Sequence, residues 1–156
     1  MGERARILVV DDDESVRKVL TTILEEEGYA VDTAKNGREA IKKSKIKFYN
    51  LALIDIRLID MEGTKLLTKV KDTTPKMRKI IITGYPSLQN AIESVNKGAD
   101  AYILKPLDMD KVLETIKDQL KKQKEEERYT QKKVGEFIET CIKELEKEQI
   151  YPQKLG

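Results

Sequence analysis

Leu51-Ala52-Leu53-Ile54-Asp55 is the segment of this chain that is most informative about its fold. Four consecutive apolar residues predict a short strand that is buried on both faces, as the strands of parallel sheets are. The run ends at a carboxylate. In open α/β sheets, ligands bind in the crevice outside the carboxyl ends of the strands. Asp55 is therefore the first candidate for a functional residue.

Three further apolar runs end at polar residues in the same way. They are residues 7–10, followed by Asp11, Asp12 and Asp13; residues 80–82, followed by Thr83 and Gly84; and residues 101–104, followed by Lys105 and Pro106. Because parallel strands bring their carboxyl ends to one edge of a sheet, we expect the acids, the hydroxyl and the amine to form one polar cluster.

Segments with helical periodicity separate these strands. Apolar residues recur at helical spacing over 16–24, 40–44, 66–70, 88–95 and 109–120, and a further strand is predicted at 29–34. Alternating strands and helices predict right-handed crossovers and an α/β fold with helices on both faces of a parallel sheet. Five strands in about 120 residues favour a flavodoxin-like, doubly wound (βα)5 domain with strand order 2-1-3-4-5 over a barrel.

The predicted fold also places particular residues. In the helix over 88–95, we expect Leu88, Ala91, Ile92 and Val95 to face the interior. In the predicted strand order, strands one and three are neighbours, which brings Asp11 and Asp12 to Asp55.

The composition excludes several classes of protein. The chain has 156 residues with 30 basic and 28 acidic side chains, a net charge of +2. No part of it is strongly basic, so the electrostatic footprint of a nucleic-acid binder is missing. With no histidine, neither His-ligated metals nor a Ser-His-Asp triad are available. A single cysteine fits a reducing compartment. No apolar run reaches the ~20 residues of a membrane span, and no signal segment precedes the first strand. We expect a cytoplasmic protein without membrane association.

The last part of the chain follows a different pattern. Charged residues dominate from Lys121 to Arg128, and a helical stripe then resumes at Val134, Phe137, Ile138, Cys141, Ile142 and Leu145. We predict one domain over 5–122. Over 123–156 we predict a charged linker and an amphipathic helix at about 131–149, separate from the preceding helix or continuous with it. The stripe would pack within the protein, form a homodimer or dock another partner, or the tail would lead to an output domain. Cys141 would be buried in the stripe.

The predicted polar cluster has the chemistry of a magnesium site. Three carboxylates in one pocket cannot all remain ionised without a counter-charge. Mg²⁺ binds carboxylate oxygens and keeps several waters, whereas zinc would need His or clustered Cys. A bound cation would let a carboxylate attack a phosphoryl group despite their like charges. Lys105 can bind a phosphate oxygen as a point charge, Thr83 can donate to another, and Gly84 keeps the adjacent loop free of side-chain bulk. The product would be an acyl phosphate on Asp55.

These motifs resemble the receiver domain of two-component response regulators. The resemblance rests on Val9-Val10-Asp11-Asp12, Leu53-Ile54-Asp55, Ile82-Thr83-Gly84 and Tyr102-Ile103-Leu104-Lys105-Pro106, and it covers residues 5 to about 122. A chemotaxis receiver is itself a standard example of the 2-1-3-4-5 strand order. The expected fold and the family resemblance are therefore not independent of each other.

The resemblance implies a role for each residue of the metal and phosphoryl site. Asp55 would be the phosphoacceptor and a metal ligand, Asp12 a direct Mg²⁺ ligand, Asp11 a ligand through water, and the backbone carbonyl of Arg57 the remaining ligand from the protein. Lys105 would bind the phosphoryl group.

The resemblance also implies a switch and its partners. A cis peptide bond would precede Pro106, and Thr83 and Tyr102 would form a switch pair that reshapes a face around the fourth helix, fifth strand and fifth helix. The phosphoryl donor would be a phosphohistidine on a sensor histidine kinase or a phosphotransfer protein, and a downstream protein would read the changed face. The family usually has Pro four residues after the acceptor. This chain has Ile59 there, which predicts a less rigid loop and affects the lifetime of the phosphorylated form.

Other interpretations stay open at this point. Asp11 to Asp13 would serve only as a helix cap, or Tyr102 would only pack at the sheet edge. A haloacid-dehalogenase-like phosphatase would use Asp11 as its nucleophile, but it would leave Asp55 without a role and it lacks a final acidic pair. A scaffold that keeps the receiver fold without phosphorylation is the third alternative. We expect a self-phosphorylating and self-dephosphorylating signalling switch rather than a turnover enzyme.

Overall fold

The computed structural model describes residues 4–150. The chain divides into two compact units, residues 1–123 and residues 124–156, so the division falls one residue after the predicted limit at 122. Residues 4–150 include no helix with the length and apolar character needed to cross a bilayer.

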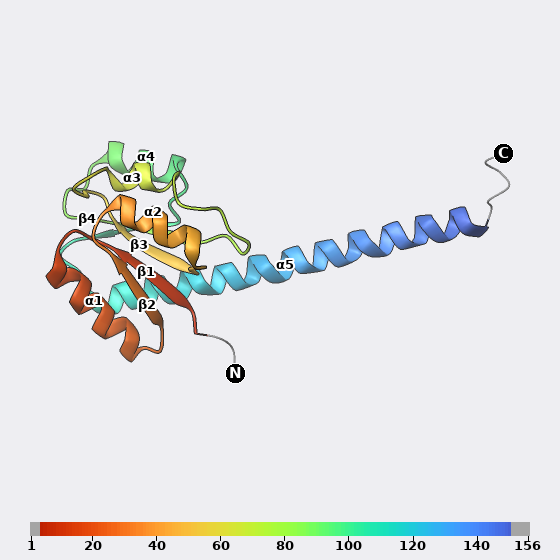
Figure 1. Cartoon of the computed structure of the whole chain (residues 1–156), viewed down its shortest axis with the longest axis horizontal. Helices are drawn as coiled ribbons and strands as arrows, with labels where there is room; N and C mark the ends of the chain where they lie inside the picture. Colours follow the sequence, from red (N-terminus) through yellow and green to blue (C-terminus); the bar gives the residue numbers. More distant parts are fainter. Residues whose placement is uncertain (1–3, 151–156) are drawn as a thin grey trace. The chain divides into compact units, whose positions relative to one another are not determined.

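The first unit is built on a five-stranded parallel sheet (Figure 1). The strands are β1 Arg6–Val10, β2 Ala30–Ala34, β3 Leu51–Asp55, β4 Arg78–Thr83 and β5 Ala101–Leu104. Their order is β2-β1-β3-β4-β5, and every neighbouring pair is parallel. The doubly wound fold and the strand order predicted from the sequence are therefore confirmed.

Successive side chains along each strand point to opposite faces of the sheet and so contribute to two hydrophobic cores. In β1, Leu8 and Val10 pack in one cluster with Leu66 and Leu67, on the face covered by α2 and α3. The neighbouring β1 residues belong to a second cluster on the opposite face, together with residues of α1 and α5: Ile7, Val9, Leu20, Leu24, Val112 and Ile116. Both faces of every central strand are thus buried, which is why residues 51–54 of β3 and residues 80–82 of β4 are unbroken apolar runs.

The helices of this unit begin at polar caps. They are α1 Glu14–Glu26, α2 Gly37–Ile46, α3 Gly63–Leu66, α4 Leu88–Asn96 and α5, which starts at Met109. The carboxylate of Asp13 accepts hydrogen bonds from the first turn of α1, and the side chains of Asn36 and Ser87 do the same for α2 and α4. Gly28 and Gly98 follow α1 and α4 with positive φ, a conformation that side chains disfavour.

Two helices differ from their prediction. The third is a four-residue helix that gives way to turns after Leu66, although Leu66, Leu67 and Val70 are buried as expected. In α4 the expected inward residues Leu88, Ile92 and Val95 are 79%, 51% and 70% exposed, so that prediction is wrong. The buried residue of α4 is Ser94, whose hydroxyl donates to the Asn90 carbonyl at 2.7 Å and is thereby satisfied inside the protein.

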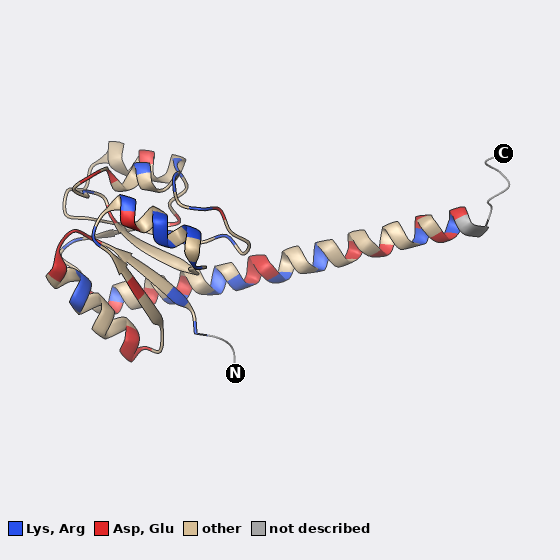
Figure 2. Ribbon diagram, in the orientation of Figure 1, with Lys and Arg blue, Asp and Glu red and all other residues tan. Residues whose placement is uncertain are grey.

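Helix α5 spans Met109–Ile150, 42 residues, without interruption. The charged segment after residue 122 is therefore helical, and the predicted helix over 131–149 is the continuation of α5, one of the two arrangements left open by the sequence. Lys, Glu, Gln and Arg are strong helix formers, and no Gly or Pro lies between Met109 and Val134. Pairs four residues apart, such as Lys122 with Asp118 at 3.2 Å, add support. Figure 2 shows both signs of charge interspersed along this helix.

The second unit leaves its apolar stripe uncovered. Val134, Phe137, Ile138, Ile142 and Leu145 are 49–72% exposed. Cys141, expected to be buried, is exposed as well. Residues 124–150 contain only a helix, so this unit provides no second layer that could cover the stripe. The pattern correctly identified an apolar face, but it did not show what would pack against it.

Candidate functional site

The strand register places the predicted polar residues on one edge of the sheet. Val10 pairs with Ile54, so Asp11 and Asp55 follow neighbouring positions of β1 and β3. Asp55 pairs with Ile82, the residue before Thr83. Thr83 in turn pairs with Leu104, the residue before Lys105. The structure therefore brings Asp11, Asp55, Thr83 and Lys105 together as the sequence predicts.

Three carboxylates form a compact group at this edge. Asp11, Asp12 and Asp55 each offer one carboxylate oxygen, and these oxygens all lie within 4.8 Å of one another. Asp11 and Asp55 are only 3% and 8% exposed, whereas Asp12 is exposed. A site made only of oxygen ligands and open to water on one side fits Mg²⁺, which retains part of its hydration shell.

The ammonium of Lys105 lies between two of the carboxylates. Its Nζ is 3.4 Å from Oδ2 of Asp11 and 3.4 Å from Oδ2 of Asp55. Burial alone would lower the pKa of Lys105, but the two carboxylates outweigh it and raise that pKa above its ordinary value. Lys105 therefore remains a cation at neutral pH. The single positive charge of Lys105 does not balance three carboxylates. A bound divalent cation would supply the remaining positive charge.

Burial also acts on Asp11. It raises the pKa of this carboxyl, and the nearby charge of Asp55 adds to the rise, while the N–H of Asp13 and the charge of Lys105 oppose it. The Asp13 N–H donates to Asp11 Oδ1 at 2.9 Å, and Arg17 donates to the Asp11 carbonyl at 2.6 Å. These bonds fix Asp11 in a site where its charge needs a partner.

Asp55 is held by the chain that follows it. The Arg57 N–H donates to Asp55 Oδ1 at 3.3 Å, which leaves Oδ2 facing Lys105. The Arg57 guanidinium stacks over the ring of Tyr85, 3.9 Å from its centroid. Tyr85 was not predicted as part of the site. It lies 28 residues from Arg57, and no spacing pattern in the sequence links two residues that far apart.

Thr83 and Tyr102 occupy the positions expected of the switch pair. Thr83 is fully buried, and its hydroxyl accepts the N–H of Tyr85 at 2.9 Å. The Tyr102 hydroxyl is also buried and has no hydrogen-bond partner among residues 4–150. A buried hydroxyl without a partner is destabilising by about 1–3 kcal/mol.

The remaining predicted residues lie beside Lys105. The peptide bond between Lys105 and Pro106 is cis, the conformation that the resemblance implies. A Cβ atom added at Gly84 would lie 3.7 Å from Cβ of Lys105, an ordinary contact. A methyl group would therefore fit at Gly84, so the glycine is less necessary than the sequence suggests.

Gly63 matters more to the site than its place in the sequence indicates. A Cβ atom there would collide with the backbone oxygen of Asp55 and lie 2.9 Å from Cα of Ile56. The Gly63 N–H donates to the Ile56 carbonyl at 2.7 Å. The glycine thus lets the start of α3 pack directly against the end of β3.

The loop between Asp55 and Gly63 is hydrogen-bonded on both sides of Ile59. The Leu58 N–H donates to the Met61 carbonyl at 3.2 Å. The Asp60 carboxylate accepts the N–H groups of Gly37 and Arg38, at 2.8 and 2.9 Å, at the start of α2. Slight burial opposes the shift, but these two N–H groups lower the pKa of Asp60. Ile59 itself is 81% exposed, between two neighbours that are both hydrogen-bonded.

Comparison with known proteins agrees with this arrangement. The family model described as response regulator receiver domain matches residues 7–117. The chain is 40% identical over 119 residues to the transcriptional regulatory protein ZraR of Klebsiella oxytoca, covering 76% of this chain and 27% of that protein. It is 33% identical over 116 residues to GlrR of Escherichia coli K12, covering 74% and 26%. The chain thus spans about a quarter of the length of the curated relatives it matches.

Solved structures show the same similarity. A CheY-like receiver domain protein from Methanospirillum hungatei JF-1 matches with a TM-score of 0.76 and 48% identity, over 80% of this chain and 99% of that one. The beryllofluoride-activated NtrC4 receiver domain dimer matches with a TM-score of 0.71 and 40% identity, over 76% and 98%. TrrA from Thermotoga maritima, in complex with Mg²⁺ and beryllofluoride, matches with a TM-score of 0.66 and 34% identity, over 74% and 98%.

Proposed function

This chain belongs to the response regulator receiver family of two-component systems, and we propose that Asp55 is the residue that accepts the phosphoryl group. One observation carries the proposal. Oδ2 of Asp55 lies 3.4 Å from Nζ of Lys105, in a group of three carboxylates whose oxygens lie within 4.8 Å of one another. A nucleophile, a phosphate-binding cation and a cation site therefore share one edge of the sheet.

The proposed reaction is an in-line transfer from a phosphohistidine of a sensor histidine kinase or phosphotransfer protein. An Asp55 oxygen forms a bond to phosphorus while the phosphorus–nitrogen bond of the donor breaks, and the released imidazole takes up a proton. The bond between the Arg57 N–H and Asp55 Oδ1 orients the carboxylate. Lys105 binds an oxygen of the transferred group, and the Thr83 hydroxyl donates to another.

Asp11, Asp12 and Asp55, with the backbone carbonyl of Arg57, are the proposed ligands of Mg²⁺. The bound ion would neutralise part of the phosphoryl charge, so that an anionic carboxylate can approach it. The carboxylate set fits this role because it contains only hard oxygen donors and includes an exposed member, Asp12.

The function is tested by incubation with Mg²⁺ and acetyl phosphate followed by intact-mass measurement. We expect one added phosphoryl group on the wild-type chain and none on the Asp55→Asn variant or after chelation of Mg²⁺. Asp13→Asn is the matched control, because Asp13 caps α1 outside the carboxylate cluster and Asn is an equally good cap. An unlabelled wild-type chain would instead favour a scaffold that keeps only the fold.

Labelling that persists in Asp55→Asn would favour the phosphatase interpretation, in which Asp11 is the nucleophile. That interpretation needs a further acidic pair after Lys105. Asp108 is engaged elsewhere, because its carboxylate accepts the N–H groups of Asp110 and Lys111 at the start of α5. We therefore propose a signalling switch rather than a turnover enzyme.

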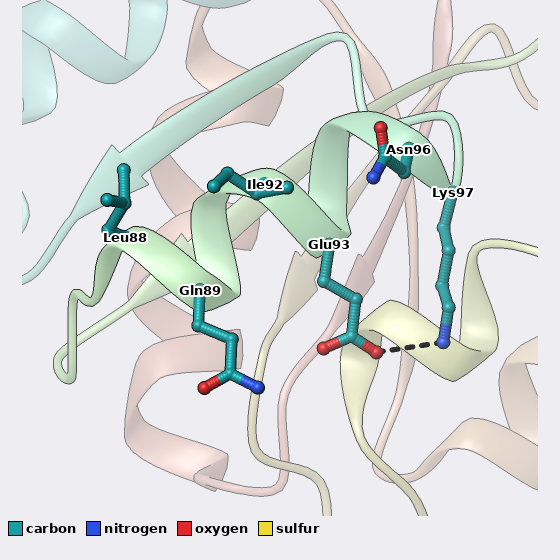
Figure 3. Close-up of a pocket in the computed structure, with 6 residues that line it drawn as sticks. All are labelled: Leu88, Gln89, Ile92, Glu93, Asn96 and Lys97. Atoms are coloured by element: carbon teal, nitrogen blue, oxygen red, sulfur yellow. Dashed lines mark hydrogen bonds and ion pairs between the residues drawn. The ribbon is translucent and has the colours of Figure 1, made fainter.

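We propose that the output is read by a downstream protein at the face formed by α4 and β5. Large apolar side chains are exposed there, among them Leu88, Ile92, Val95 and Leu104. Figure 3 shows Leu88 and Ile92 along α4, in a pocket that Glu93 and Lys97 also line, and these two residues form an ion pair at 2.8 Å. Tyr102 lies on β5, which pairs with β4, the strand that ends at Thr83. Movement of Thr83 and Tyr102 would change this pocket.

We further propose a cytoplasmic location and self-association through the second unit. The exposed free thiol of Cys141 is compatible with a reducing compartment. Among the similar structures, the NtrC4 receiver is a dimer. For this chain, the exposed stripe of α5 is the feature that supports a homodimer.

A further inference from the structure

The apolar stripe of the second unit has the spacing of a coiled-coil seam. Val134, Ile138, Cys141 and Leu145 follow one another at intervals of four, three and four residues. This is the 3.5-residue repeat that keeps one seam of a helix facing a partner helix. Every described residue of the stripe is exposed, so the seam is fully available.

Two further apolar residues flank the seam, one on each side. In heptad notation, Val134 and Cys141 are at d, Ile138 and Leu145 at a, Phe137 at g and Ile142 at e. Phe137 and Ile142 are 72% and 49% exposed. Positions e and g select the partner and its direction in a coiled coil.

We propose that a second copy of this chain covers this face, as a parallel, in-register two-stranded coiled coil over residues 134–145. This proposal rests on the proposed function in one respect: it specifies the partner and the geometry for the self-association of the second unit. In a parallel pair, position g of one helix meets position e, five residues later, on the other. Phe137 then packs on Ile142 of the second copy, and Ile142 packs on Phe137 of the second copy.

The flanking residues disfavour an antiparallel pair. In that arrangement g meets g and e meets e, so Phe137 would lie near Glu144 of the second copy and Ile142 near Gly135. The first pairing would place a carboxylate against an aromatic ring, and the second would leave Ile142 without a side chain to contact. The parallel arrangement matches apolar with apolar on both sides.

Charge distribution agrees with a second copy as the occupant. The charged residues of this segment lie mostly at b, c and f, away from the seam: Lys132, Lys133, Glu136, Glu139, Lys143, Glu146 and Lys147. A parallel dimer therefore brings no like charges together at the seam. Gln131 and Glu148, at the next a and d positions, are polar and limit the seam to four layers.

The size of the face sets the expected strength. An apolar patch of a few hundred Å² is what marks an interaction site on a soluble protein, whereas a standard stable interface buries about 800 Å² on each partner. Four core layers on about 18 Å of helix lie below that standard. We expect a reversible dimer that depends on protein concentration.

The register places the two copies of Cys141 in the same d layer. Disulfides need Cα atoms about 4.4–6.8 Å apart, a separation that paired core positions of a parallel coiled coil provide. Cys141 is the only cysteine of the chain. Oxidation of the two thiols by oxygen with copper–phenanthroline as catalyst would form one disulfide per dimer, with reduction of the oxygen. In an antiparallel dimer, Cys141 would lie opposite Ile138 instead.

The test measures the mass of the full chain by sedimentation equilibrium over a range of concentrations, for three proteins. Wild type is expected to dimerise, and Ile138→Asn, which puts an amide in the seam, is expected to raise the dissociation constant at least about tenfold, or 1.4 kcal/mol. Thr140→Asn, which places the same side chain at the outer c position, is expected to match wild type. Circular dichroism checks that α5 keeps its helix content in each protein.

Each outcome decides the proposal. The proposal is supported if wild type forms dimers that cross-link through Cys141 and if Ile138→Asn weakens these dimers. Cys141→Ser must then abolish the cross-link. A monomer at every concentration overturns it, as does a dimer unaffected by Ile138→Asn. A dimer that loses its mass in Ile138→Asn but does not cross-link overturns the parallel register. Phosphorylation of Asp55 is measured separately on the same proteins, so failure of the dimer is distinguishable from failure of the receiver function.

Discussion

The two parts of α5 carry the same kind of apolar stripe, but the stripe is buried in the first part and exposed in the second. In the first unit, Val112 and Ile116 are fully buried against the sheet. In the second unit, every described side chain from residue 124 to residue 148 is exposed. Helical periodicity therefore identifies which face of a helix is apolar, but the rest of the molecule decides whether that face is a core or a surface for binding.

The transition between the two parts is marked by buried amides rather than by a break in the helix. The Nε2 of Gln123 donates to the carbonyls of Asn50 and Lys76 at 2.9 and 2.8 Å. The side chain of Asn50 in turn accepts the N–H of Arg6 at 2.8 Å. These bonds satisfy carbonyls at the amino-terminal edge of the sheet, where the last buried turn of α5 ends.

We expect glycine substitutions to show the largest difference in stability effects between the two units. Gly63→Ala, in the first unit, would drive a methyl group into the backbone beside Asp55, and we expect a loss of about 2–4 kcal/mol in the free energy of unfolding. Gly135→Ala, in the second unit, meets no described atom within 4 Å and would gain about 0.5–1 kcal/mol of local helix stability. Urea unfolding and circular dichroism measure the two effects.

Gly84→Ala is the control for Gly63→Ala within the first unit. Its added methyl group makes only an ordinary contact with Lys105, so we expect little change in the urea midpoint. Equal losses for Gly63→Ala and Gly84→Ala would show that the close approach of α3 to β3 is not what makes Gly63 necessary.

Replacement of glutamine tests the last buried turn of α5. Gln123→Ala removes the donor for two carbonyls, and we expect a loss of about 1–3 kcal/mol in the free energy of unfolding. Gln131→Ala, eight residues further along the same helix, changes an exposed side chain and should be neutral or slightly stabilising. Similar effects at the two positions, measured by urea unfolding, would contradict the division of the helix after Gln123.

The hydrogen-bonded pair Tyr49 and Asp32 makes the stability of the first unit depend on pH. The Tyr49 hydroxyl donates to Asp32 Oδ2 at 2.7 Å. Burial opposes the shift, but this bond and Lys47 lower the pKa of Asp32 below its ordinary value. The stabilisation is then complete above the unfolded-state pKa of about 3.9 and is lost as the pH falls through the lower folded-state pKa.

Tyr49→Phe measures this contribution. We expect the variant to be less stable than wild type by about 1.5–3 kcal/mol at neutral pH, since the acceptor is charged. The difference should shrink below about pH 4. A difference that stays constant from pH 7 to pH 3 would show that the phenol stabilises the fold by packing alone.

Removal of the second unit should have the smallest effect on stability. Deletion of residues 124–156 leaves all of the sheet and both cores, so we expect the thermal midpoint of the first unit to change by no more than a few degrees. The same deletion should abolish self-association in sedimentation equilibrium. A large fall in the midpoint would show that the two units are not independent in stability.

Much of the site could be predicted because strand ends are visible in a sequence. Buried parallel strands are continuous apolar runs, so the residues that follow them, such as Asp55, Thr83 and Lys105, could be assigned to one edge before any coordinates were known. Asp60, Gly63 and Tyr85 could not be found in this way. Their roles depend on contacts with distant backbone or with a distant guanidinium, and neither type of contact leaves a periodic trace.

Two predictions fail for the same physical reason. The exposed face of α4 and the exposed Cys141 were both assigned to the interior because apolar spacing was taken to mean burial. The charged segment after residue 122 was predicted as a linker because it lacks an apolar face, although its residues favour helix on their own. Local propensity and tertiary burial are separate properties, and the second unit of this chain has the first without the second.

We propose that Asp55, rather than a neighbouring carboxylate, carries the phosphoryl group. The most direct test is phosphorylation of the full chain with Mg²⁺ and acetyl phosphate, reduction of the acyl phosphate with borohydride, and peptide mapping by mass spectrometry. Reduction converts a phosphorylated aspartate to homoserine, which marks the acceptor permanently. We expect homoserine at position 55 only. Homoserine at position 11 or 12, or none in a protein whose fold is intact, would contradict the account.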